Sequence, residues 1–219
     1  ERLAVRKLSE WANSFFPNAL AHYRIAKSQA EDIYLKKLTG QEKRGALERV
    51  NTNLQEGDRL LALAQSIQPN PPTRVGLAAT LKARALYFSG APKEQVEKLF
   101  KEARDAYSLG NSGGVFQITY RTFNDFYYSA FLARAYGNAR ASDIRKILQP
   151  LYNYFATPQD PRKRNSRTSS FLIAARDSKD PLYPAPDFNR TDIERLGSLY
   201  PEFGKMIENF DLKKYLNGL

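Results

Sequence analysis

The sequence predicts an all-α protein built from stacked antiparallel helical hairpins. Apolar residues recur with the spacing of a helix face, and no useful length of chain alternates with the period of two that strands require. Short turns marked by glycine separate the apolar helical segments. Because short connections make successive helices antiparallel neighbours, we expect an α-solenoid or an irregular helical bundle, with more than half of the residues in helices.

A leading helix is expected near residues 2–15, and three helical hairpins follow it. Each hairpin turn contains a glycine, which adopts the left-handed conformation after a helix at no steric cost. The expected hairpins pair residues 19–38 with 41–67, 73–89 with 93–109, and 115–136 with 141–156.

The stretch LLALAQSIQPNPP, residues 60–72, shows how these helices end. Leu60, Leu61, Ala64 and Ile67 share one helix face, and the prolines that follow lack the amide protons that a helix needs. The same apolar offsets recur twice further along the chain, at 99–106 and 147–154. We therefore expect three helices with equivalent C-terminal faces.

Leu61, Ala64 and Pro69 resemble the end of the second helix of a tetratricopeptide repeat, and Phe100 with Ala103 is similar to the corresponding large and small pair. The resemblance covers about residues 41–110, with a longer spacing than the usual period of the family. It implies a stacked helical-hairpin scaffold of a class that mostly binds other proteins, and it implies no enzyme activity.

Composition changes after Phe155, where the apolar periodicity stops. We expect a helical-hairpin domain at 1–156, and a basic loop and proline-rich segment at 157–219 that packs on the same domain as a loop-rich wrap. Short helices are predicted to begin near Thr191, Pro201 and Asp211.

The formal charge of +11 favours acidic partners, namely nucleic acid, anionic lipid headgroups or acidic protein surfaces. Much of this charge lies in one window, residues 134–167, which has only two acidic residues. Its basic residues are Arg134, Arg140, Arg145, Lys146, Arg162, Lys163, Arg164 and Arg167. We expect the last seven of these to take part in partner binding.

The residues that carry chemistry are few. Cysteine is absent, which excludes disulfides, thiolate nucleophiles and cysteine-based metal sites. His22 is the only histidine, and no hydrolase, metalloprotease or phosphate-loop motif accompanies it. Acidic residues are dispersed among arginines and lysines. We therefore predict no enzyme activity, no cofactor and no metal.

The segment 115–136 is the most aromatic of the predicted helices. Its aromatic residues cover two faces, which is typical of a central core helix, and Arg121 is placed to pair with Asp125 four residues later. We expect Tyr128 to be the exception that reaches the surface. With Tyr87 and Tyr107 it forms a second candidate partner-binding site in a hairpin groove.

Two functions fit these patterns best, and an enzyme with carboxylate chemistry that no linear motif reveals comes third. The first is a non-enzymatic protein-binding scaffold or adaptor that uses the concave surface of its helical repeats, with an acidic protein as partner. The second is a nucleic-acid-binding helical protein that uses the basic window. No stretch reaches the roughly 18 apolar residues that a membrane-spanning helix needs.

The setting that the sequence favours is the periplasm or a bacterial envelope assembly, rather than the cytoplasm. Exported bacterial proteins can lack cysteine, and the chain starts at Glu1 without a leader, as expected if a signal or anchor had been removed upstream.

Replacing Arg162, Lys163, Arg164 and Arg167 together by serine should weaken binding of an acidic partner and leave the melting temperature nearly unchanged, because a solvated loop contributes little to a core. Added salt should weaken binding of the wild type more than that of the variant. The measurement is the affinity for a partner recovered by pull-down with and without nuclease. Unaltered affinity at low salt would move the site to the tyrosine groove.

Overall fold

The computed structural model describes residues 2–109, 115–157, 169, 172 and 190–217, and every element in them is a helix. The predicted all-α class is confirmed. The chain forms two compact units, Glu1–Asn111 and Ser112–Leu219. This division differs from the one expected near residue 156, because the C-terminal helices share a core with the preceding hairpin.

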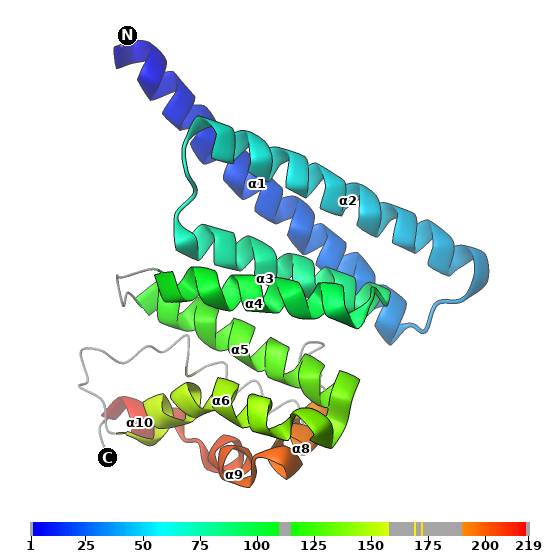
Figure 1. The fold of residues 1–219 in the computed structure, drawn as a ribbon, viewed down its shortest axis with the longest axis vertical. Coiled ribbons are helices and arrows are strands. Elements are labelled where there is room, and N and C mark those ends of the chain that lie inside the picture. The colour runs from blue at the N-terminus through cyan, green and yellow to red at the C-terminus, as the bar shows by residue number, and fades with distance from the viewer. Residues whose placement is uncertain (1, 110–114, 158–168, 170–171, 173–189, 218–219) are drawn as a thin grey trace. The chain divides into compact units, whose positions relative to one another are not determined.

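Unit 1 consists of four helices in two antiparallel hairpins (Figure 1). These are α1 (Arg2–Leu35) with α2 (Gly40–Ile67), and α3 (Pro72–Ser89) with α4 (Lys93–Leu109). Helix α1 also packs along α3 in the same direction: Arg74 lies over the Phe16 ring at 4.8 Å, and further along both helices Arg84 pairs with Glu31 at 3.2 Å. Helices α1 and α3 therefore end on the same side of the unit.

Helix α1 continues through the expected break near residues 16–18, and Pro17 lies inside it. Phe16 and Ala19 are buried on either side of this exposed proline, so the apolar face persists across it. Proline removes one backbone hydrogen bond, to the carbonyl four residues earlier. That carbonyl belongs to the exposed Asn13, where water can replace the bond. Burial of the face outweighs the loss, and the two expected helices are one.

The remaining helix ends of unit 1 follow the predicted turn residues. Helix α2 stops before Pro69, and α3 starts with Pro72 in its first turn. Gly90 ends α3 in the left-handed conformation with φ of 84°, and its amide and that of Ala91 donate to the last carbonyls of the helix. Ala64 and Ala103, the two alanines of the repeat-like pattern, are both buried.

A tyrosine packs against a glycine in each hairpin of unit 1. A Cβ atom added to Gly57 of α2 would lie 2.7 Å from the ring of Tyr23 of α1, and one added to Gly76 of α3 would lie 2.7 Å from the ring of Tyr107 of α4. Both distances are shorter than van der Waals contact. The two glycines therefore give the facing rings their space, which offsets the cost of glycine within a helix, about 1 kcal/mol.

Unit 2 contains α5 (Val115–Tyr136), a 3₁₀ turn (Gly137–Arg140), α6 (Ala141–Ala156), α8 (Arg190–Leu199), α9 (Pro201–Asn209) and α10 (Leu212–Asn217). The predicted hairpin of 115–136 with 141–156 and the helix starts near Thr191, Pro201 and Asp211 are confirmed. At α10, an Asp211 side-chain oxygen accepts the Lys214 amide at 3.1 Å, as a helix-capping residue does.

Aromatic contacts join the C-terminal helices to the hairpin within unit 2. Phe126 of α5 lies 6.4 Å from Phe203 of α9, and Phe155 of α6 lies 5.3 Å from Phe210 and 5.7 Å from Tyr215. The C-terminal helices are therefore part of the core of this unit, and α5 is largely a core helix as its pattern predicted.

Gly57→Ala should lower the free energy of unfolding by about 1–3 kcal/mol, because the new methyl group displaces a ring that a hydrogen bond holds in place. Gly45→Ala is the matched control in the same helix. Its Cβ would meet only the Arg49 side chain, at 3.7 Å, so it should raise stability by about 0.5–1 kcal/mol. Urea unfolding of both variants measures the difference. Equal stabilisation by both would contradict the close contact.

Candidate functional site

A groove of about 680 Å³ opens in unit 1 where α1 ends, α2 begins and α3 ends. We call it the aromatic groove. Its lining residues are Ile33, Tyr34, Leu35, Lys37, Leu38, Lys43, Tyr87, Phe88, Ser89 and Gly90.

Three aromatic rings form a continuous surface in the aromatic groove. The Phe88 ring centroid lies 5.5 Å from that of Tyr34 and 5.1 Å from that of Tyr87. Tyr34 is 41% exposed and its neighbour Leu35 is 52% exposed. Large apolar side chains that are exposed together, beside a hollow, are typical of a surface that binds a partner.

The fold brings these residues together because α1 and α3 run in parallel. Tyr34 and Leu35 occupy the last turn of α1, and Tyr87 and Phe88 occupy the last turn of α3. The left-handed Gly90 stops α3 directly after them, so that no further turn of α3 covers the rings. The last turns of α1 and α3, the turn after α1 and the first turn of α2 thus form the groove.

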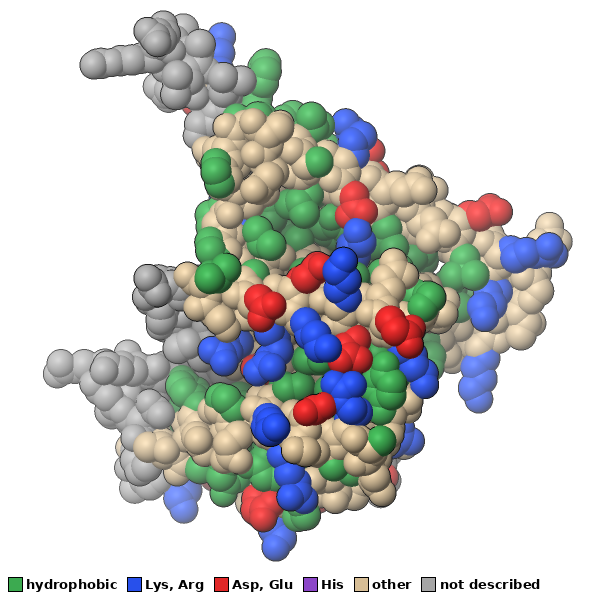
Figure 2. Space-filling view, viewed as in Figure 1, with side chains coloured by type: hydrophobic (Ala, Val, Ile, Leu, Met, Phe, Trp, Pro, Cys, Tyr) green, Lys and Arg blue, Asp and Glu red, His purple; other side chains and the backbone are tan. Residues whose placement is uncertain are grey.

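Lysines supply the charge of the aromatic groove, and among the described residues no acidic side chain lines it. Within the described part of the chain, Lys37 and Lys43 form no ion pair, whereas the adjacent Lys36 pairs with Asp32 at 3.3 Å. Figure 2 shows basic side chains gathered at this end of unit 1, on the right of the view. The groove is therefore apolar with a positive rim.

Lys37 adopts a left-handed backbone conformation with φ of 49° in the turn between α1 and α2. This conformation is unfavourable for a residue with a side chain. The turn therefore holds a lysine at a position where glycine would be more stable.

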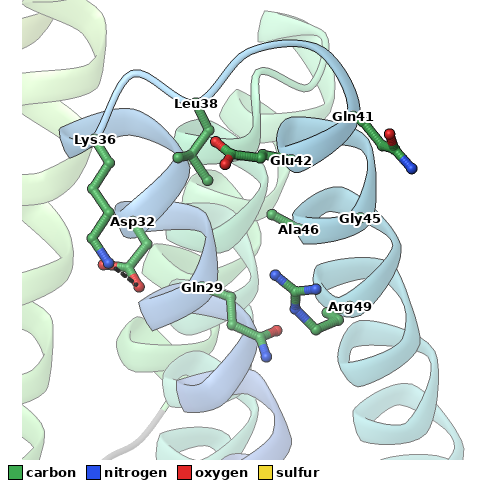
Figure 3. Close-up of a pocket in the computed structure, with 9 residues that line it drawn as sticks. All are labelled: Gln29, Asp32, Lys36, Leu38, Gln41, Glu42, Gly45, Ala46 and Arg49. Atoms are coloured by element: carbon green, nitrogen blue, oxygen red, sulfur yellow. Dashed lines mark ion pairs between the residues drawn. The ribbon is translucent and has the colours of Figure 1, made fainter.

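A second hollow, of about 540 Å³, lies between α1 and α2 (Figure 3). Gln29 and Arg49 extend into it from the two helices, and it also contains Asp32, Lys36 and Glu42. Both signs of charge are present, and no aromatic side chain of the described residues lines it. This hollow has less to offer a protein ligand than the aromatic groove.

The structure separates the three tyrosines of the predicted hairpin groove. Tyr87 lines the aromatic groove. Tyr107 is 1% exposed and Tyr128 is 2% exposed. The expectation that these two side chains reach a binding surface is therefore corrected: Tyr107 fills the space left by Gly76, and Tyr128 lies on a buried face of α5 in the other unit.

Several predicted cations of the basic window take part in contacts within unit 2. Arg134 forms a two-pronged ion pair with the buried Asp192, and Arg140 pairs with Asp143 and lies over a tyrosine ring. Burial raises the pKa of Asp192, although Arg134 acts in the opposite direction. The side chains of Arg134 and Arg140 therefore stabilise contacts within unit 2.

Arg145 and Lys146 are the exposed part of the basic window in α6. The Nε of Arg145 donates to the Leu199 carbonyl at 2.8 Å, and both side chains border a hollow of about 470 Å³. The predicted run of Arg162, Lys163, Arg164 and Arg167 lies outside the described residues.

His22 serves as a structural link between α1 and α2, where its Nδ1 lies 2.8 Å from the side-chain oxygen of Asn53. Across the residues that the structure describes, no three histidine, aspartate or glutamate side chains are grouped as a metal ion would require. Helices in the same residues are either too short or too polar to cross a membrane.

Comparisons with protein-family models, with curated proteins and with solved structures find no match to this chain. The candidate site therefore depends on geometry alone.

Five residues that line the aromatic groove were not expected at a binding site: Tyr34, Leu35, Lys37, Lys43 and Phe88. For Tyr34, Leu35 and Lys37 a signal existed: the apolar residues of α1 continue for two positions past the buried Ile33, and two lysines follow directly. An apolar helix end followed by lysines indicates a surface rather than a core.

Lys37→Gly should raise the free energy of unfolding by about 0.5–1 kcal/mol, because glycine adopts positive φ without a steric penalty. Lys36→Gly is the control, since Lys36 has no positive φ and gains nothing from the change. Thermal and urea unfolding measure both. A loss of stability in both variants would show that the turn does not hold Lys37 in this conformation.

Proposed function

We propose that this chain is a non-enzymatic protein-binding scaffold that holds its partner in the aromatic groove of unit 1. The observation that carries the proposal is the exposure of Tyr34 and Leu35 beside the rings of Tyr87 and Phe88. Burial of such a surface by a partner removes apolar area from water, which is the main favourable term in protein association.

The distribution of exposed apolar residues supports unit 1 as the binding unit. Among the described residues, the large apolar side chains that are most exposed all belong to it. They are Trp11, Ile25, Tyr34, Leu35, Leu63, Val75 and Leu109. Tyr34 and Leu35 are distinguished from the others because they lie together at a hollow with a further aromatic surface.

The arrangement of helices also supports a scaffold. Two antiparallel hairpins with their first helices side by side and parallel are the arrangement of helical-repeat proteins, which bind partners along surfaces formed by equivalent helices. We propose a tetratricopeptide-like arrangement for unit 1 on this basis. A bacterial envelope assembly, the setting favoured by the sequence, is part of the same proposal.

The residues that line the aromatic groove are not those typical of a catalytic site. The titratable groups that line it are those of lysine and tyrosine, and no carboxylate or imidazole accompanies them. Catalytic sites usually pair a carboxylate or an imidazole with a second titratable group, and the described lining holds neither of these two groups.

The double variant Tyr34→Ala/Leu35→Ser should lose the partner, because it removes the exposed apolar wall of the groove while leaving the buried core intact. Ile25→Ser/Leu63→Ser removes similar exposed apolar groups elsewhere in unit 1 and is the control. The intact chain and both variants are used as bait in the native extract, with and without nuclease, and recovered proteins are quantified.

We expect the wild type and the control to recover the same protein in both conditions, and Tyr34→Ala/Leu35→Ser to lose it with an unchanged melting temperature. Equal recovery by all three chains would contradict the proposal. Loss of every partner on nuclease treatment would instead favour nucleic-acid binding.

A further inference from the structure

We infer that the aromatic groove binds a short acidic-apolar segment of a protein, in which one bulky apolar residue is flanked by aspartate or glutamate. This inference rests on the proposed function and adds the chemistry of the partner. It follows from the way apolar and charged groups are distributed over the groove.

The apolar part of the groove fits one large side chain. Tyr34 and Leu35 are contributed by α1, and Tyr87 and Phe88 by α3, while the half-buried Leu38 adds apolar surface from the turn. The Phe88 ring is tilted against the rings of Tyr34 and Tyr87. In this arrangement both faces and edges of the rings can contact a ligand. An aromatic or large aliphatic residue would gain most from this environment.

The charged part of the groove selects carboxylates. Lys37 and Lys43 come from the turn and from the first turn of α2, and the described lining contains no acidic residue that would compete with a ligand. The neighbouring hollow differs in this respect, because Asp32 and Glu42 line it. Charge complementarity therefore points to an acidic ligand at the aromatic groove and not at its neighbour.

The C-terminal ends of α1 and α3 carry partial negative charges that oppose the lysines. These partial charges are smaller than the lysine charges. A helix C-terminus is equivalent to about half a negative charge, so that the two ends together amount to about one. At α3 the carbonyls of Leu86 and Tyr87 already accept the amides of Gly90 and Ala91. Two full lysine charges and the N-terminus of α2 outweigh these partial charges, and the groove stays positive.

A peptide fits these features better than a nucleic acid does. Backbone phosphates call for a row of cations along a track, together with stacking faces. The groove offers two lysines, and its aliphatic residues Ile33, Leu35 and Leu38 add apolar surface that base stacking does not use. Single-stranded nucleic acid is therefore the competing outcome of the test.

The test begins with a library of random 16-residue peptides displayed on phage and selected on the intact chain. A peptide with the enriched motif is then synthesised with a fluorescent label, and its affinity is measured by polarisation. A labelled thymidine oligonucleotide serves as the nucleic-acid probe. Three variants are compared with the wild type: Lys37→Glu/Lys43→Glu, Tyr34→Ala/Leu35→Ser, and Lys213→Glu/Lys214→Glu as the charge-matched control on exposed lysines of α10.

We expect enriched peptides to combine a bulky apolar residue with two or more acidic residues. Lys37→Glu/Lys43→Glu and Tyr34→Ala/Leu35→Ser should each weaken peptide binding by about tenfold or more, and the control should change it less than about twofold. Salt should weaken the wild type more than Lys37→Glu/Lys43→Glu. Unchanged melting temperatures would show that the variants fold.

Peptides without acidic residues that still depend on Tyr34 and Leu35 would overturn this inference and leave the proposed function intact. Peptides that bind all variants equally, or no enrichment at all, would overturn both. Binding of the oligonucleotide with the same dependence on Lys37 and Lys43, and no peptide binding, would assign the groove to nucleic acid and also overturn both.

Discussion

The hydrogen bond between Tyr23 and Asp58 is the interaction on which the arrangement of unit 1 depends. The Tyr23 hydroxyl of α1 donates to Asp58 of α2 at 2.7 Å, and Lys82 of α3 binds the same carboxylate at 2.6 and 2.8 Å. Three helices therefore meet at one side chain. The bond forms because Gly57 lets the Tyr23 ring approach α2 closely. Burial, followed by the hydrogen bond to Asp58, raises the pKa of Tyr23, so the hydroxyl keeps its proton and stays a donor.

A buried charge cluster fixes α1 against α3 nearer to the aromatic groove. Glu31 pairs with Arg84 at 3.2 Å and with Lys27 at 3.0 Å, and burial, with the Arg84 charge, lowers the pKa of Lys27. Such a cluster adds little net stability compared with apolar packing, because desolvation of the charges offsets their attraction. It does disfavour other registers of α1 on α3, since a shift would leave charges buried without partners. The register matters because it brings Tyr34 level with Phe88.

The helices could be predicted from the sequence because local rules decide them. Glycine and proline act through their own backbones, so the ends of α2 and α3 follow from Pro69, Pro72 and Gly90 alone. The break expected in α1 was wrong for a non-local reason: packing on both sides of Pro17 outweighs one lost hydrogen bond. Tyr107 was misassigned for the same reason, because its burial depends on the missing side chain of Gly76 in another helix. When the burial of a residue depends on a glycine in another helix, the apolar spacing of its own helix does not predict that burial.

The candidate site was the least predictable part, because it lies where two helices end together. Periodicity shows which residues share a face within one helix, but it does not show that α1 and α3 run in parallel and stop at the same level. Parallel packing converts two ordinary last turns, with Tyr34 and Leu35 on one and Tyr87 and Phe88 on the other, into one apolar surface. The same end of the unit collects lysines, and their charge keeps an exposed apolar surface compatible with solubility. The two properties that suit a binding groove thus arise from one topological feature.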